Sequence, residues 1–192
     1  MHAPAPNLDI QPVTADRWDD LAQLFGPSGA YSGCWCMWWR VKGSQFSANG
    51  NAGNQAAMQS IVARDEVPGL LAYAEGAPVG WISLGPREAF GRLQRSPLLK
   101  PIDEQSVWSI VCFFIHRDHR SQGVAMALIT AAEDYARAQG ARILEAYPID
   151  TGGSTKDQAA IFTGTAAMFR RAGYQEAARR KETRPILRKN LL

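Results

Sequence analysis

The chain of 192 residues is 46% hydrophobic and 20% charged, a composition typical of one globular domain and not of a disordered chain. No apolar run approaches the roughly 20 residues that span a bilayer, and the N-terminal stretch MHAPAPNLDIQPV lacks the basic and apolar regions of a secretory signal. Three cysteines do not make a disulfide framework, and a net charge of +3 does not call for nucleic acid, so we expect a cytoplasmic protein without a nucleic-acid or membrane partner.

The first half of the chain predicts a strand, two helices and a β-hairpin. Residues 8–13 favour a strand, and the apolar spacing over 14–25 predicts a helix that ends at Gly26-Pro27. A polar, glycine-rich stretch up to about Gly53 is expected to be a loop, followed by a second helix that ends near Arg64. Two strands, 69–75 and 78–84, are expected to pair through a tight turn at Glu75-Gly76-Ala77.

The second half predicts a strand–helix–strand unit followed by a helix and two strands. Its expected elements are a helical turn at 89–94, a buried strand at 107–115, a helix at 123–139, a strand at 142–147, a helix at 163–172, and strands at 174–179 and 183–188. The strands on either side of the helix 123–139 should run parallel. We therefore predict a single α/β domain over 1–192, with a mixed sheet between helices and with residues 1–7 flexible.

A candidate anion site follows the buried strand, in the segment IHRDHRSQGVA that begins at Ile115. The helix after it begins at Gly123, and its first backbone N–H groups lack partners within the helix, so they favour a phosphate. Arg120 adds a positive charge, and small Ala125 leaves the approach open. The simpler alternative is an ordinary strand-to-helix turn with a solvated basic flank.

The spacing Arg-x-x-Gly-x-Ala over 120–125 resembles the acetyl-CoA motif of GNAT-type N-acetyltransferases. The hairpin 76–82 and the helix end 167–174 are also similar to that family, and its order of elements extends from about residue 8 to 189. The segment Cys-Trp-Cys-Met-Trp-Trp-Arg over 34–40 resembles an uncharacterised bacterial subgroup. The resemblance implies a GNAT fold and acetyl-CoA as cosubstrate, with no metal.

The resemblance also implies which residues bind acetyl-CoA. Pantetheine would bind the backbone at Phe113 and Ile115, with Phe114 between them, and its thioester would point into a gap beside the strand 142–147. The pyrophosphate would lie on the amides of Arg120, Ser121, Gln122, Gly123, Val124 and Ala125. Phe169 and Arg170 would flank the pantetheine arm.

The residues expected to carry catalysis depart from the family pattern. A glutamate that some members carry on the fourth strand is Ser109 here, which can at most orient a water. A tyrosine that many members carry before the glycine at the end of the last helix is Phe169, which cannot donate a proton. Tyr147 is the substitute that we can name, and an ordinary buried aromatic is the alternative for it. Cys112 is more in keeping with a small buried side chain than with a nucleophile.

The tryptophans between the first two helices are candidate substrate-binding residues. Trp35, Trp38 and Trp39 would form an aromatic wall or hold a cationic acceptor by cation–π contact. The alternative is an apolar plug that covers the sheet, and exposed tryptophans would instead favour a homodimer. The loop 150–162 is a candidate lid on the opposite side.

The favoured function is direct transfer of an acetyl group to a primary amine of a small molecule in a ternary complex. A non-catalytic sensor or subunit that binds CoA or acyl-CoA is the alternative, because the family glutamate and tyrosine are missing. A nucleic-acid binder using 179–181 and 188–189 is disfavoured, since the basic run is short and interrupted by Glu176 and Glu182.

Overall fold

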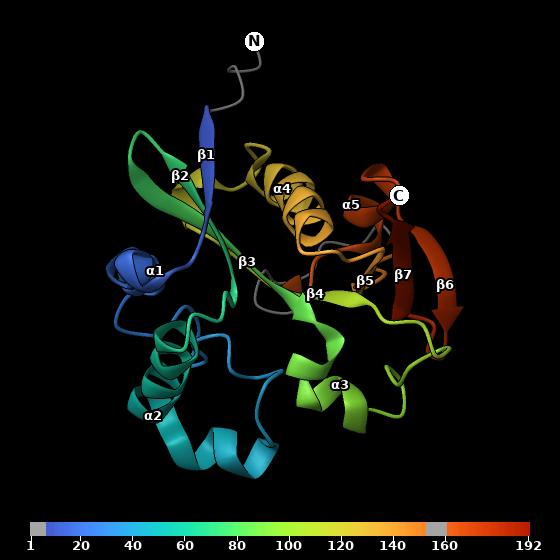
Figure 1. The fold of residues 1–192 in the computed structure, drawn as a ribbon, viewed down its shortest axis with the longest axis horizontal. Coiled ribbons are helices and arrows are strands. Elements are labelled where there is room, and N and C mark those ends of the chain that lie inside the picture. The colour runs from blue at the N-terminus through green and yellow to red at the C-terminus, as the bar shows by residue number, and fades with distance from the viewer. Residues whose placement is uncertain (1–6, 153–160) are drawn as a thin grey trace.

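In the computed structural model, which describes residues 7–152 and 161–192, seven strands form one sheet in the order β1-β2-β3-β4-β5-β7-β6 (Figure 1). The strands are β1 Leu8–Pro12, β2 Gly69–Ala74, β3 Ala77–Pro86, β4 Trp108–Ile115, β5 Ile143–Ala146, β6 Gln175–Arg179 and β7 Pro185–Asn190. All neighbours are antiparallel except β4 and β5, which are parallel. The mixed α/β domain predicted from the sequence is confirmed, whereas the expected flexibility of 1–7 falls almost entirely outside the described residues.

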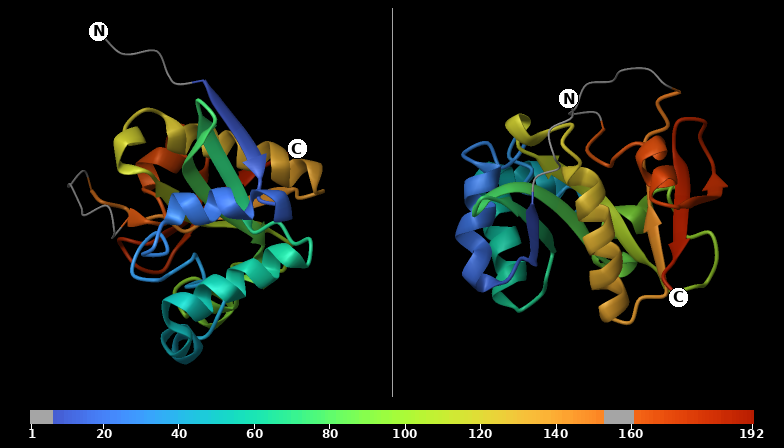
Figure 2. Two further views of the ribbon diagram at one scale, coloured as in Figure 1. Left: turned by 90° about the vertical axis from the view of Figure 1, so that its left-hand side faces the viewer. Right: turned by 90° about the horizontal axis from the view of Figure 1, so that it is seen from above.

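Helices cover both faces of the sheet (Figure 2). They are α1 Trp18–Phe25, α2 Gly43–Ala63, α3 Gly91–Arg95, α4 Val124–Ala138 and α5 Ala166–Arg171. The first two pack on one face, and α4 and α5 pack on the other. None of the helices in the described ranges is long and apolar enough to cross a bilayer.

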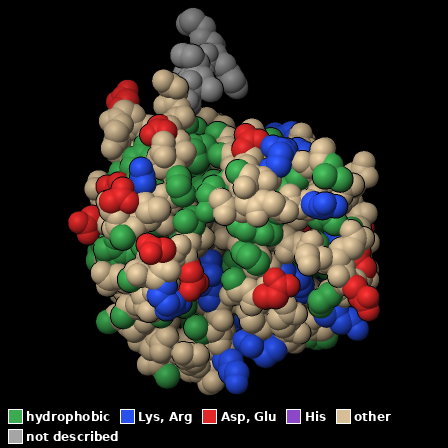
Figure 3. Space-filling model, in the orientation of Figure 1, with side chains coloured by type: hydrophobic (Ala, Val, Ile, Leu, Met, Phe, Trp, Pro, Cys, Tyr) green, Lys and Arg blue, Asp and Glu red, His purple; other side chains and the backbone are tan. Residues whose placement is uncertain are grey.

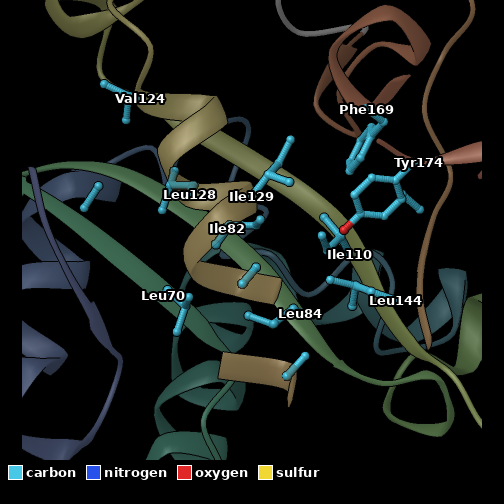
Figure 4. Packing of buried hydrophobic residues seen from close by; sticks show 14 of the residues in the cluster. Leu70, Ile82, Leu84, Ile110, Val124, Leu128, Ile129, Leu144, Phe169 and Tyr174 are labelled. Atoms are coloured by element: carbon cyan, nitrogen blue, oxygen red, sulfur yellow. The ribbon is translucent and has the colours of Figure 1, made fainter. Parts of the chain in front are cut away.

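Apolar clusters on both faces hold the helices to the sheet, and a third cluster includes Leu93 of α3. Leu70 and Leu71 are neighbours on β2 whose side chains point to opposite faces, as strand geometry requires. Leu70 packs in the cluster under α4 with Leu128, which is 0% exposed (Figure 4). Burying one such leucine stabilises the fold by roughly 1.5–3 kcal/mol. Leu71 and Trp81 pack under α1 and α2 instead.

The turn between β2 and β3 has the geometry that its residues predict. Glu75 and Gly76 both have positive φ, at 50° and 79°, which is the pattern of a type I′ turn. Ala74 and Ala77 form the pair next to the turn. The hairpin therefore pairs β3 with β2, and the other edge of β3 pairs with β4.

The prediction of a loop up to Gly53 is wrong, because α2 begins at Gly43. The helix is kinked at Gly50, whose φ is 58°. Its glycines and asparagines have low helix propensity, but two of them anchor it to the preceding segment. Asn51 accepts a 2.6 Å hydrogen bond from the Trp35 indole, and Asn54 donates to the Gly33 carbonyl at 3.0 Å. These tertiary contacts outweigh the local propensity.

The last helix is shorter than the predicted range 163–172. Gly164 has a φ of 79°, which is not helical, and α5 begins only after Thr165. The Thr165 hydroxyl accepts a hydrogen bond from the Met168 amide at 3.3 Å, the usual contact of a helix N-cap.

Candidate functional site

The two parallel strands β4 and β5 separate halfway along β4. They pair only over Trp108–Ile110 and Leu144–Ala146. Against β3, Ser83 pairs with Cys112 while Leu84 pairs with Ile110, so Val111 is an extra residue in β4. A bulge of this kind bends a strand. The backbone of β4 beyond Val111 thus diverges from β5, and we call the gap between them the splay.

The turn between β4 and α4 presents backbone amides beside the splay. No side chain caps α4, so its first N–H groups have no partner from a capping residue. Ser121 and Gly123 have positive φ values of 60° and 85°, and a Cβ on Gly123 would meet no atom within 4 Å. Two side-chain bonds brace the turn: Arg120 Nε donates to the Ile115 carbonyl at 3.1 Å, and Gln122 Nε2 donates to the Asp118 carbonyl at 2.8 Å. This open helix start suits an anion.

The predicted amide set is brought together by this turn. All of the residues singled out there lie on the turn or in the first turn of α4: Arg120, Ser121, Gln122, Gly123, Val124 and Ala125. Val124 is 1% exposed, because its side chain packs into the core under α4. Its contribution to an anion site is therefore limited to the backbone.

On the edge of β4 that faces the splay, one backbone N–H group already has a hydrogen-bond partner. The Phe113 amide donates to the Phe162 carbonyl at 2.7 Å, so the segment at Phe162 lies along β4 where β5 has diverged. The side chains alternate: Phe113 packs against Phe169, with ring centres 5.9 Å apart, and Phe114 packs against Phe25 on the opposite face at 5.8 Å. Residues predicted to bind an extended ligand arm are thus at the splay, and one of their hydrogen bonds is intramolecular.

A cavity of about 420 Å³ lies near Phe162, whose ring packs against the lining residue Trp39. Its wall is formed by Trp38 and Trp39, by α3 with the residues after it, and by Arg184 from the turn between β6 and β7. Trp39 lies 6.3 Å from the Phe162 ring, and Arg184 donates to the Thr163 hydroxyl at 3.0 Å. Two lining residues of the cavity, Trp39 and Arg184, therefore contact the segment 162–163 that lies along β4.

A buried polar network joins β4 to β5 at the point where the splay begins. Ser109 and Tyr147 are both 0% exposed, and their hydroxyls are 2.8 Å apart. The Tyr147 hydroxyl donates to Glu145 Oε1 at 2.6 Å and accepts from Arg87 Nη1 at 2.5 Å. Arg87 and Glu145 form an ion pair at 2.9 Å, and the Glu145 side chain is 1% exposed. Burial, followed by the charge of Glu145, raises the pKa of Tyr147 well above its usual value, so this hydroxyl keeps its proton.

The comparison with known proteins agrees with this geometry. The model of the acetyltransferase (GNAT) family matches residues 35–159, which is well over half of the chain. The chain belongs to the GNAT acetyltransferase family. The enzyme class predicted from the sequence, a GNAT-type N-acetyltransferase, is thereby confirmed.

Solved structures share the fold of this GNAT enzyme at low sequence identity. The PaiA N-acetyltransferase of Thermoplasma acidophilum, in complex with coenzyme A, has a TM-score of 0.56 and 11% identity over 96% of this chain and 99% of that one. A GNAT-family acetyltransferase of Listeria monocytogenes has a TM-score of 0.58 and 11% identity over 99% and 98%. YncA of Salmonella typhimurium, with its cofactor acetyl-CoA, has a TM-score of 0.54 and 14% identity over 97% and 95%. No curated protein sequence matches this chain.

The two side chains predicted to catalyse acetyl transfer lie in the buried network. The structure brings Ser109 and Tyr147 together, but neither side chain is exposed, and the Tyr147 hydroxyl is bonded to Ser109 and Glu145. A catalytic role would need a route from the splay to these groups. Sequence reasoning missed their partners Arg87 and Glu145; the signal for Glu145 was a carboxylate within the apolar stretch ILEAY.

Two predicted ligand-contacting aromatics belong to the core instead. Phe169 is 0% exposed and packs between Phe113 and Tyr174, so it does not present a surface to a pantetheine arm. Trp35 is 3% exposed and stacks on Trp18, with ring centres 5.9 Å apart. Of the two alternatives given for Trp35, the structure agrees with the apolar plug that covers the sheet and not with the wall of an acceptor site.

The remaining predicted contacts lie at the surface or beside the cavity. Trp38 and Trp39 line the cavity, but the face of Trp38 is covered by the Arg92 guanidinium, 3.7 Å from the ring centre. The enzyme's own arginine thus occupies the cation–π position expected for a substrate. Arg170 is exposed and forms ion pairs at 3.3 Å with Asp150 and Glu176. Most of the predicted lid, 153–160, lies outside the described residues.

The cysteines of the GNAT enzyme are free thiols near one another. Cys36 is 4% exposed and accepts a 3.2 Å hydrogen bond from the Trp81 indole. Burial and the nearby Cys36 raise the pKa of Cys34 to about 11, and a hydrogen bond with Cys36, followed by burial, raises that of Cys112. No group of ligands that could hold a metal occurs among the described residues.

Proposed function

We propose that this GNAT enzyme transfers the acetyl group of acetyl-CoA directly to a primary amine of a small molecule in a ternary complex. The observation that carries the proposal is the uncapped start of α4, with open space at Gly123, directly beside the splay of β4 and β5. The positive end of the helix supports a pyrophosphate there. Beyond Ile110, β4 has no β5 partner, so an extended arm could add to this edge in place of the Phe162 segment.

The helix start fits the pyrophosphate of acetyl-CoA as it stands, whereas the pantetheine would require one hydrogen bond of β4 to change. The amides of 120–125 would hold the pyrophosphate, with Arg120 adding charge. The Phe113 amide would bind the pantetheine only after it releases the Phe162 carbonyl, which it binds at 2.7 Å here. Exchange of one hydrogen bond for another costs little net free energy, on the order of 1 kcal/mol or less.

The chemistry forms an N–C bond and breaks the thioester C–S bond, while the amine loses a proton and the CoA sulfur gains one. Deprotonating a lysine-like amine at pH 7 costs roughly 4–5 kcal/mol. No exposed carboxylate stands at the Ser109 position on β4, so we propose that proximity and orientation of the activated thioester supply most of the rate. Ser109 and Tyr147 act as positioning residues that hold β4 to β5 where the splay begins.

The burial of Ser109 and Tyr147 also favours a second candidate, a CoA-binding protein without catalysis. The two candidates differ in one measurement. The enzyme releases free CoA thiol when acetyl-CoA and an amine are both present, and the sensor binds acetyl-CoA without releasing thiol.

The test is calorimetric titration of acetyl-CoA into the wild type, Gly123→Asp and Gly123→Asn. Asp and Asn both tolerate the left-handed backbone of position 123 and both cap helices, so the two variants should fold alike. Only Asp places a negative charge against the pyrophosphate. We expect Gly123→Asp to bind at least about tenfold more weakly than Gly123→Asn. No binding by the wild type would contradict both candidates.

A further inference from the structure

The cavity beside the splay is lined by three arginines and by no carboxylate. Arg92 and Arg95 come from α3, and Arg184 comes from the turn between β6 and β7. The lining otherwise consists of two tryptophans, two leucines, a serine and a glycine. Lys and Arg side chains also gather at the lower edge of the face shown in Figure 3, in the region of α3. The cavity is therefore strongly basic.

These three arginines lack the counter-charges that other arginines of the chain have. Within the described residues, none of the three has a carboxylate oxygen within 4.0 Å, whereas Arg87 and Arg188 both pair with Glu145. Arg184 instead donates to the Tyr147 carbonyl and the Thr163 hydroxyl, both at 3.0 Å. Burial lowers its pKa, with no compensating acid.

Part of the Arg92 guanidinium has no hydrogen-bond partner among the described residues. Its Nε donates to the Trp38 carbonyl at 2.6 Å and its plane covers the Trp38 ring. Its Nη2 is buried and has no hydrogen-bond partner in the described residues. Burial and the charge of Arg95 lower the pKa of Arg92, which reflects two like charges without a shared anion.

Such a group of cations repels an amine that carries only positive charge and attracts an anion. A guanidinium binds carboxylate or phosphate through parallel N–H donors, which gives both affinity and orientation. We infer that the acceptor is an amine that also carries an anionic group, a carboxylate or a phosphate, and that Arg92, Arg95 and Arg184 bind this group. The inference rests on the proposed function, because it names the acceptor for the same transfer.

The position of Arg184 connects the anion site with the reaction site. Its guanidinium reaches the carbonyl of Tyr147, the residue directly after β5, and the hydroxyl of Thr163. Thr163 follows Phe162, whose carbonyl holds the Phe113 amide on the opposite side of the splay. An acceptor whose anion lies against Arg184 would therefore direct its amine toward the gap between β4 and β5.

A second hollow, of about 580 Å³, has the opposite charge. It is lined by Asp9, Asp20 and Glu75 among others, with Arg17 as its one arginine. These residues belong to β1, α1 and the β2–β3 turn, at the far edge of the sheet from β5. Of these two cavities, the one whose lining contacts Phe162 and Thr163 is thus the basic one.

The first experiment compares matched amines as acceptors, using release of CoA thiol from acetyl-CoA. The pairs are phenylalanine with phenethylamine, and phosphoethanolamine with ethanolamine, which differ in the anionic group. We expect kcat/KM to be at least about tenfold higher for the anionic member of one pair, and the pair that shows it identifies carboxylate or phosphate. Equal or better use of both amines that lack the anionic group would overturn the inference.

The second experiment substitutes the cavity arginines. Arg95 is exposed and makes no hydrogen bond to a described residue, so Arg95→Gln should fold normally, and Arg184→Gln is the stronger variant. Both should raise KM for the anionic amine by about tenfold and leave KM for acetyl-CoA unchanged. Arg64→Gln, an exposed arginine paired with Glu66 at the end of α2, is the control. Equal losses for the amines with and without the anionic group would contradict the assignment.

Direct titration of the anionic amine, without acetyl-CoA, separates this inference from the proposed function. If the wild type binds the amine and Arg184→Gln does not, the result supports the anion site. Failure of acetyl-CoA to bind would overturn only the proposed acetyl transfer. Equal binding of the amines with and without the anionic group would overturn the anion site, whatever the result with acetyl-CoA.

Discussion

The Ser109 hydroxyl lies 2.8 Å from the Tyr147 hydroxyl, across the two central parallel strands. Tyr147 has one hydroxyl proton, which it donates to Glu145 at 2.6 Å. A carboxylate only accepts, so Ser109 must be the donor to Tyr147. The Tyr147 oxygen thus collects hydrogen bonds from Ser109 and Arg87, and the network holds β4 and β5 together where they begin to diverge.

Tyr147→Phe should destabilise the fold without changing the chemistry. Removal of the hydroxyl leaves Ser109, Arg87 and Glu145 each without one buried partner, at a cost of about 1–3 kcal/mol in the free energy of unfolding. Urea unfolding measures this, with Tyr73→Phe as control, because the Tyr73 hydroxyl makes a single half-buried bond to Asp20 at 2.7 Å. The pH profile of kcat/KM should keep its shape. If Tyr147→Phe instead removed the basic limb of this pH profile and left the stability unchanged, Tyr147 would be the proton donor.

Gly80→Ala should displace the start of α4, which packs against Gly80 of β3. A Cβ at Gly80 would lie 2.7 Å from Val124 Cγ1 and 3.2 Å from Leu128 Cδ1. Overpacking of this kind costs about 1–3 kcal/mol, and displacement of Val124 moves the amides of the anion site. We therefore expect lower stability and weaker binding of acetyl-CoA, measured by urea unfolding and calorimetry. Gly85→Ala, on the same strand with its nearest atom at 3.8 Å, should change neither quantity. Normal acetyl-CoA binding by Gly80→Ala would show that the site does not depend on this packing.

The Cys34 thiol should be a slow nucleophile near neutral pH. Its pKa of about 11 means that roughly one thiol in a thousand is ionised at pH 8. Alkylation of Cys34, mapped by peptide mass spectrometry with Cys34→Ser as control, should accelerate about tenfold per pH unit up to pH 10. The unfolded chain ionises at a lower pH, near the ordinary thiol value of 9.0, so the stability contributed by this group should be lost as pH rises from about 9 to 11. Fast labelling of Cys34 that does not vary with pH would favour an acyl-cysteine intermediate.

Local sequence signals were sufficient for most of the elements and for the open helix start at Gly123. The start of α4 depends on Gly123 and on residues within one turn of it, and the hairpin depends on Glu75 and Gly76. These conformations follow from backbone sterics and from helix ends, which act over a few residues. The sequence did not predict the first half of α2, because its contacts are not local. Asn51 and Asn54 bond to residues that are 16 and 21 positions away in the chain.

The sequence by itself determined the unit of β4, turn and α4 on which the proposed pyrophosphate site rests, and with it the family. Only the tertiary structure decided what surrounds that unit. It buried Ser109 and Tyr147, paired Arg87 with Glu145 at a separation of 58 residues, and gathered Arg92, Arg95 and Arg184 around one cavity. Burial and charge at a site depend on segments that are distant in the chain, and a single sequence without its fold does not specify which of them meet.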